Sequence, residues 1–149
     1  MQRIFLDTNV YILGQLNPAS NEELILKWVG FYDSDLRSQI QVIISEELIK
    51  QILRVCKRVR NKDWGSKIVD RIWKNLNYVL VPKTEELQAE ADLLLTNKLI
   101  PSEDILIYLS AKYGKADRFV SGNRELISAI ADFPCLTSED FVRQYILTL

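Results

Sequence analysis

Two aspartates are the residues of this sequence whose type and position best suit them to chemistry. Asp7 directly follows a short apolar run at residues 4–6, and Asp104 lies in the first turn of a predicted helix that begins at Pro101. Carboxylate oxygens are the ligands that Mg²⁺ and similar hard cations prefer. Both aspartates also have a structural interpretation, because an acid at the start of a helix can cap it or offset its dipole. Their positions alone do not decide between metal binding and a structural role at a helix start.

A polar segment follows a second apolar run, at residues 118–120. Gly122 permits a tight turn with positive φ, and Asn123 is well suited to cap the next helix. Capping is the simpler role for Asn123. Its side-chain amide can also hold a metal-bound water, although it adds no negative charge.

The composition excludes several kinds of catalytic site. The chain has no histidine, which rules out Ser-His-Asp and Cys-His triads and histidine zinc sites. Cys56 and Cys135 are far apart, which matches neither a disulfide framework nor a zinc site. The net charge of −1 indicates that any nucleic acid is held by a local patch or through a metal ion.

Length and hydropathy indicate a single domain spanning residues 1–149. Hydrophobic residues make up 48% and charged residues 26%, as in soluble globular proteins. The first apolar run is too short for a signal peptide, and no stretch approaches the ~18 apolar residues of a membrane span. We therefore expect no membrane partner and a cytoplasmic location.

Short continuous apolar runs alternate with helical patterns, which predicts an α/β fold with a parallel sheet covered by helices on both faces. Ligands bind beyond the carboxyl ends of the strands in such sheets. The predicted strands are residues 4–6, 42–44, 78–81, 118–120 and 135–136. The predicted helices are residues 10–13, broken at Gly14, then 20 to about 33, 45–56, 64–76, 84–95, 101–113, 124–130 and 137–146.

Three segments carry a resemblance to a known family. They are Ile-Phe-Leu-Asp-Thr-Asn-Val at 4–10, Pro-Ser-Glu-Asp-Ile-Leu at 101–106 and Ala-Asp-Arg-Phe-Val-Ser-Gly-Asn at 116–123. In order and spacing they resemble the PIN domain across the whole chain. The resemblance implies a three-layer α/β/α sandwich around a parallel sheet of about five strands. It also implies a nuclease that uses Mg²⁺ or Mn²⁺; many members cut RNA as the toxin half of a toxin–antitoxin pair.

The resemblance also implies which residues form the site. Asp7 matches the first acid of the family and Asp104 a later one, and Asn123 stands where an aspartate is usual, as in some subfamilies. We expect these three to hold the metal. Gln51 occupies the position of a usual glutamate, six residues after a serine, and Glu47 lies one turn earlier on the same helical face and could replace it.

The two amides at positions 51 and 123 leave the site with fewer carboxylates than a four-acid site. Metal-dependent cleavage should therefore be weaker or slower. The alternative is a catalytically weak or inactive PIN-like module that binds nucleic acid or protein. Glu125 is a further acid that could lend charge.

A basic run suggests a contact surface. Arg54, Lys57 and Arg58 precede Arg60 and Lys62 with no acid among them. A solvated helix face is one interpretation, and contact with an RNA backbone or an acidic antitoxin segment is the other. The partners implied by the resemblance are RNA, a small antitoxin protein and a second copy of the chain. Exposed apolar positions on the last helix are candidates for such a homodimer contact.

Overall fold

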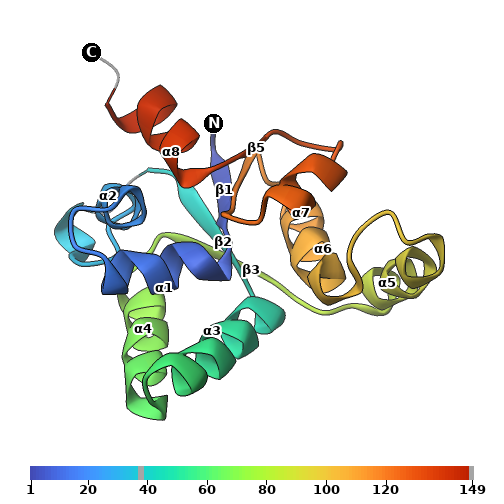
Figure 1. Ribbon diagram of the computed structural model, residues 1–149, viewed down its shortest axis with the longest axis horizontal. Helices are drawn as coiled ribbons and strands as arrows, with labels where there is room; N and C mark the ends of the chain where they lie inside the picture. Colours follow the sequence, from blue (N-terminus) through green and yellow to red (C-terminus); the bar gives the residue numbers. More distant parts are fainter. Residues whose placement is uncertain (37–38, 148–149) are drawn as a thin grey trace.

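The protein contains one sheet of five strands, all parallel, in a computed structural model that describes residues 1–36 and 39–147 (Figure 1). The strand order is β3-β2-β1-β4-β5. The five predicted strands are confirmed as β1 (Arg3–Leu6), β2 (Gln41–Ser45), β3 (Tyr78–Val81), β4 (Arg118–Val120) and β5 (Cys135–Leu136).

Helices cover both faces of the sheet. Figure 1 shows α1, α2 and α4 on the left of the sheet and α5, α6 and α7 on the right, so the three-layer α/β/α architecture is confirmed. None of the helices described could cross a membrane, since none is both long and apolar enough. The helices are α1 (Thr8–Leu16), α2 (Asn21–Trp28), α3 (Glu46–Val59), α4 (Lys62–Asn75), α5 (Glu85–Asn97), α6 (Ile105–Tyr113), α7 (Arg124–Ala129) and α8 (Ser138–Phe141), with 3₁₀ turns at Ser34–Leu36 and Ser102–Asp104 and a π-helical turn at Val142–Ile146.

The central strands form the core because both of their faces are covered. Ile4, Phe5 and Leu6 of β1 are fully buried, and the ring of Phe5 stacks on Phe119 of β4 with a centroid distance of 5.4 Å. The direction in which strands are added reverses between β1 and β4. In doubly wound sheets a crevice forms at this reversal, beyond the carboxyl ends of the two strands.

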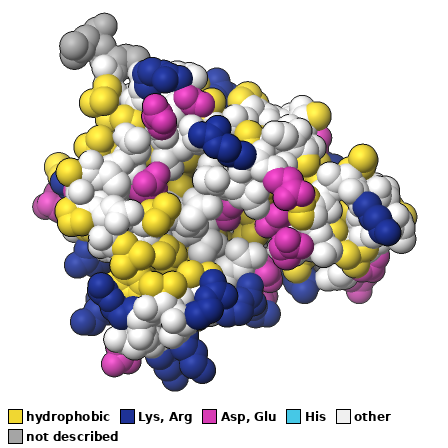
Figure 2. Space-filling model, viewed as in Figure 1, with side chains coloured by type: hydrophobic (Ala, Val, Ile, Leu, Met, Phe, Trp, Pro, Cys, Tyr) yellow, Lys and Arg dark blue, Asp and Glu magenta, His cyan; other side chains and the backbone are white. Residues whose placement is uncertain are grey.

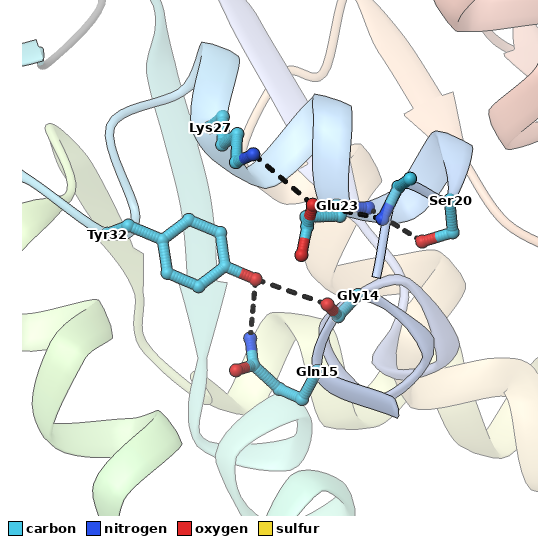
Figure 3. Close-up of polar contacts among 7 residues, drawn as sticks. Gly14, Gln15, Ser20, Glu23, Lys27 and Tyr32 are labelled. Carbon is cyan, nitrogen blue, oxygen red and sulfur yellow. Dashed lines mark hydrogen bonds and ion pairs between the residues drawn. The ribbon is translucent and has the colours of Figure 1, made fainter. Parts of the chain in front are cut away.

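The predicted break of the first helix at Gly14 is wrong, because α1 continues through it to Leu16. A Cβ at Gly14 would lie 2.5 Å from Leu26 Cδ1, so glycine is needed for the close approach of α2. Figure 3 shows the Tyr32 hydroxyl close to Gly14 and Gln15 of α1; it donates to the Gly14 carbonyl and accepts from the Gln15 side chain, both at 3.2 Å. These two hydrogen bonds join α1 to the segment that follows α2.

The second helix starts as predicted but ends earlier. The Ser20 hydroxyl caps the helix by accepting from the Glu23 N–H at 3.1 Å (Figure 3). The Glu23 carboxylate accepts from the N–H of Ala19, the residue before the cap, at 3.1 Å. The helix stops at Trp28 rather than near residue 33, because Gly30 adopts a φ of 87° and the chain turns away.

The last helix exposes less apolar surface for a homodimer contact than predicted, because Phe141 and Val142 are buried and Tyr145 and Ile146 are half-buried. Phe141 is fully buried and packs edge-on against Trp28 of α2, with ring centroids 5.5 Å apart. Three of the exposed leucines, Leu93, Leu95 and Leu99, lie on and after α5, which stands apart at the far right of Figure 1. The others are Leu36, Leu53, Leu80 and Leu147. Cys56 and Cys135 are free thiols, as expected.

Asp117 fastens the start of β1 to the segment before β4. Its Oδ2 accepts backbone N–H bonds from Gln2 at 2.7 Å and Arg3 at 2.9 Å. The bonds from Arg3 and Gln2 hold the pKa of Asp117 below its usual value. A depressed carboxyl pKa stabilises the fold above the unfolded-state pKa of about 4, and this contribution is lost as pH falls through the folded-state pKa.

We therefore expect Asp117→Ala to lower the free energy of unfolding by about 1–2 kcal/mol at neutral pH. Asp117→Asn keeps an acceptor oxygen but no charge, so it should cost less. The difference between wild type and Asp117→Asn should shrink as pH falls below about 4. Urea unfolding at several pH values measures this, and a difference that does not change with pH would contradict it.

Candidate metal and nucleic-acid site

A cleft of about 320 Å³ lies beyond the carboxyl ends of β1 and β4. Its walls come from α1, α3 and the starts of α6 and α7, so segments distant in sequence meet there. It is lined by Asp7, Thr8, Asn9, Ile12, Leu13, Gln51, Val55, Asp104 and Asn123. The structure thus places four of the five predicted site residues in one cleft.

Asp7 lies at the floor of the cleft and is only 7% exposed. One carboxylate oxygen accepts from the Thr8 N–H at 2.7 Å, which caps α1, and the other accepts from the Ser121 hydroxyl at 2.7 Å. Burial raises the pKa of Asp7, while the bonds from Ser121 and Thr8 oppose the rise. The carboxylate is therefore fixed in position in surroundings that disfavour an uncompensated negative charge.

Asp104 lies across the cleft and is half-buried. Its Oδ2 accepts from the side-chain amide of Asn123 at 3.2 Å. Burial raises the pKa of Asp104, and the negative charges of Asp7 and Glu103 raise it further, against the bond from Asn123. Glu125, which is exposed on α7, adds a smaller effect in the same direction. A bound cation would relieve this concentration of negative charge.

Ser121 and Asn123 connect the two aspartates. Ser121 is fully buried, and its hydroxyl accepts from the Asn123 N–H at 3.0 Å while donating to Asp7. The predicted capping role of Asn123 is confirmed, since its Oδ1 accepts from the Leu126 N–H at 3.1 Å. Its amide nitrogen faces Asp104, so Asn123 positions that carboxylate.

The sequence did not single out Ser121 as a site residue. The signal was present, because Ser121 follows β4 directly, just as Asp7 follows β1. Parallel strands end at the same edge of a sheet, so residues in these two positions become neighbours.

On α3 an amide, not an acid, faces the cleft. Gln51 Oε1 accepts from the Thr8 hydroxyl at 2.9 Å, and Gln51 Nε2 donates to Glu47 at 3.4 Å. Glu47 lies one turn earlier and borders a separate small pocket with Ser45 and Lys50. Glu47 therefore contacts Gln51 without lining the cleft itself.

The donor set of the cleft fits a hard cation that keeps most of its waters. Among residues 1–36 and 39–147, no three His, Cys, Asp or Glu side chains are grouped so that they could hold a metal. Two carboxylates are available, from Asp7 and Asp104. Mg²⁺ is commonly bound through one or two carboxylates and several waters, so these residues suit Mg²⁺ or Mn²⁺.

The predicted basic contact residues lie on the same helix as Gln51. Arg54, Lys57 and Arg58 are all exposed on α3. Figure 2 shows dark blue side chains gathered at the bottom of the molecule, over α3 and α4. Val55, an apolar residue between them, lines the cleft.

No protein-family model matches the chain, and comparison with curated protein sequences finds no relative. Solved structures are similar over most of it. The chain resembles one in VapBC2 of Rickettsia felis bound to a promoter DNA fragment, with a TM-score of 0.66, 13% identity and coverage of 91% of this chain and 98% of that one. It also resembles a chain in VapBC-1 of nontypeable Haemophilus influenzae, with a TM-score of 0.65, 17% identity and coverage of 93% of this chain and 99% of that one.

A third similar structure is FitAcB from Neisseria gonorrhoeae, with a TM-score of 0.60, 19% identity and coverage of 91% of this chain and 98% of that one. The matched chains are the toxin components of these complexes, which are PIN-domain proteins. At these identities the similarity establishes architecture. The chain therefore has the PIN-domain fold, as the segments around Asp7, Asp104 and Asn123 predict.

Proposed function

We propose that this protein is the toxin of a toxin–antitoxin pair and that it hydrolyses RNA phosphodiester bonds with Mg²⁺ or Mn²⁺. The observation that carries the proposal is the pair of aspartates, Asp7 and Asp104, facing one cleft at the reversal of strand order. The similarity to toxin components of solved complexes supports the toxin role.

Asp7 and Asp104 would hold the metal ion. Bound there, the ion would lower the pKa of a water ligand to supply a nucleophile at neutral pH. The protein's own part is to keep the two carboxylates fixed. Ser121 and Thr8 hold Asp7, and Asn123 holds Asp104. Because these supporting groups are neutral, they place no positive charge beside the carboxylates that would compete with the cation for them.

A second candidate function is a PIN-like binding module with weak or no catalysis. The observation that favours it is the presence of amides at Gln51 and Asn123, which leaves two carboxylates lining the cleft. Fewer carboxylates weaken the hold on a divalent cation. Calorimetry with Mn²⁺ separates the candidates, since the nuclease must bind the ion and the module need not.

The first prediction concerns the two aspartates. Asp7→Asn and Asp104→Asn should each lower cleavage of RNA by about 100-fold or more, because losing a metal ligand costs at least as much as losing its hydrogen-bond partner. The assay compares cleavage with Mn²⁺, with Mg²⁺ and with EDTA. The matched control is Asp92→Asn on α5, an exposed acid outside the cleft, which should leave cleavage unchanged. Wild-type levels of cutting by both site variants would exclude this cleft as the active site.

The second prediction concerns a double variant that transfers one carboxylate of α3 from position 47 to position 51, one helical turn further along. The double variant Glu47→Gln, Gln51→Glu keeps the net charge but puts a third acid into the cleft. The Thr8 hydroxyl can still donate to position 51, since a carboxylate accepts as an amide oxygen does. Affinity for Mn²⁺ should rise by roughly tenfold or more, and cleavage should speed up.

Glu47→Gln alone is the control for that experiment. It removes the same acid without placing a charge in the cleft, so the affinity for Mn²⁺ should stay near that of wild type. Calorimetric titration of all three proteins gives the comparison. If the double variant binds Mn²⁺ no better than wild type, position 51 does not contribute to the metal site.

The partners follow from the proposed role. An antitoxin would be a small protein that binds this chain, and RNA would be the substrate. A homodimer and a cytoplasmic location remain predictions of the resemblance and of the sequence. Light scattering of the purified protein measures whether it dimerises, and Leu93 and Leu95, exposed on α5, are among the apolar side chains that such a contact could use.

A further inference from the structure

The strand β3 lies at the edge of the sheet with one of its sides unpaired. Among residues 1–36 and 39–147 it pairs only with β2, in a parallel ladder in which Val42 is in register with Tyr78. The Val42 N–H donates to the Asn77 carbonyl at 2.8 Å. In a parallel ladder of this register, the main-chain groups of residues 77, 79 and 81 point toward β2. The N–H and C=O groups of Tyr78 and Leu80 therefore point away from β2, along what we call the open edge.

The open edge has little of the protection that proteins usually give to edge strands. Such strands are commonly blocked by charged side chains, by prolines, by bulges or by a covering element. The four residues of β3 are uncharged, and Tyr78 and Leu80 are 41% and 56% exposed. Pro82, just after the strand, has no N–H to donate. It limits the open edge to the main-chain groups of Tyr78 and Leu80.

Apolar side chains lie beside the open edge. Tyr78 and Leu80 project from the same face of the sheet, because side chains alternate along a strand. Trp73 of α4 is partly exposed and packs edge-on against Tyr78, with ring centroids 5.0 Å apart. Trp73, Leu80 and Ile49 of α3 line an open groove of about 390 Å³. The edge therefore offers both hydrogen-bonding groups and apolar contact surface.

The free main-chain groups of β3 are complementary to those of a second copy. In an antiparallel pair with Val79 opposite Val79, Tyr78 of each copy lies opposite Leu80 of the other. Both residues have their N–H and C=O at the open edge, so each such pair exchanges two hydrogen bonds and no free group is left over. Neighbouring registers that keep each face continuous do less well. Centring on Leu80 sets Tyr78 opposite Pro82, which cannot donate, and centring on Tyr78 sets Leu80 opposite Leu76, which caps the end of α4.

The side chains fit the same register. Directly opposite residues of an antiparallel pair project from the same face, so the Tyr78 ring of each copy meets Leu80 of the other, and Trp73 lies beside Tyr78. Aromatic and aliphatic pairs of this kind stabilise sheets. The two Lys83 side chains, the first charges after the strand, lie at opposite ends of the paired strands.

We propose that two copies of this chain associate through their β3 strands, antiparallel and centred on Val79, so that their sheets join into one about a two-fold axis. Such a contact closes on itself and leaves neither β3 edge open. The shared strand is short, so the dimer should be weak and dependent on concentration. None of the residues that line the cleft of Asp7 lies on β3, so the contact needs neither metal nor RNA.

Sedimentation velocity of the full chain in EDTA, over a range of concentrations, tests the contact. Leu80→Lys places a charge opposite Tyr78 in both halves of the contact, so the dimer dissociation constant should rise about tenfold or more. Leu80→Pro removes an N–H that β2 does not use, as edge strands tolerate, and should weaken the dimer at least as much. The matched control is Leu93→Lys, the same change at an exposed leucine of α5, which should leave the constant unchanged. Circular dichroism checks that each variant is folded.

Disulfide formation tests the register. The two Val79 residues lie opposite each other at a position without hydrogen bonds, where Cα atoms are about 4.5 Å apart and a disulfide can form. Val79→Cys should therefore give a covalent dimer on mild oxidation. Tyr78→Cys is the control, since position 78 is more exposed but lies opposite Leu80, and it should cross-link much less. Wild type, with its free Cys56 and Cys135, gives the background.

Three results would overturn the proposal. A monomer at every concentration would leave the open edge to solvent or to a strand of another protein. A dimer that is weakened by Leu93→Lys and not by Leu80→Lys would place the contact on α5. Equal cross-linking of Tyr78→Cys and Val79→Cys would mean that the strands do not pair in this register. Because every measurement is made without metal or RNA, its outcome is independent of whether the protein is a nuclease.

Discussion

The hydrogen bond from Ser121 to the buried carboxylate of Asp7 is the interaction on which the rest of the site depends. A carboxylate that is only 7% exposed loses its hydration, and it stays in place only if protein donors replace the water. Those donors come from two directions, the N–H of Thr8 at the start of α1 and the hydroxyl of Ser121 at the end of β4. Because β1 pairs with β4, Ser121 lies next to Asp7 and can donate this hydrogen bond to the buried carboxylate.

The walls of the cleft depend on close helix packing. Gly14 lets α2 approach α1, and Gly65 lets α4 approach α3, where a Cβ would lie 2.9 Å from that of Cys56. Because each wall is held from behind by a second helix, the side chains that line the cleft are fixed by packing. Rigid supporting elements are what a metal site needs, since ligands must be held close to their working geometry.

Charge is distributed unequally along the cleft. Two carboxylates face its inner end, and the amides of Gln51 and Asn123 surround them without adding charge. Arg54 and Arg58 are exposed on α3, which supplies one wall, and α1, which supplies another, contains no charged residue.

The sequence by itself determined the strands, most helix starts and the positions of Asp7 and Asp104. These follow from local causes: continuous apolar runs, capping residues, and the rule that ligands gather at strand ends. Tertiary structure decided the rest. Whether Gln51 or Glu47 faces the cleft depends on the rotation of α3 on the sheet, and the passage of α1 through Gly14 depends on Leu26 of another helix. Local periodicity cannot encode such contacts, because they join residues that become neighbours only when the chain has folded.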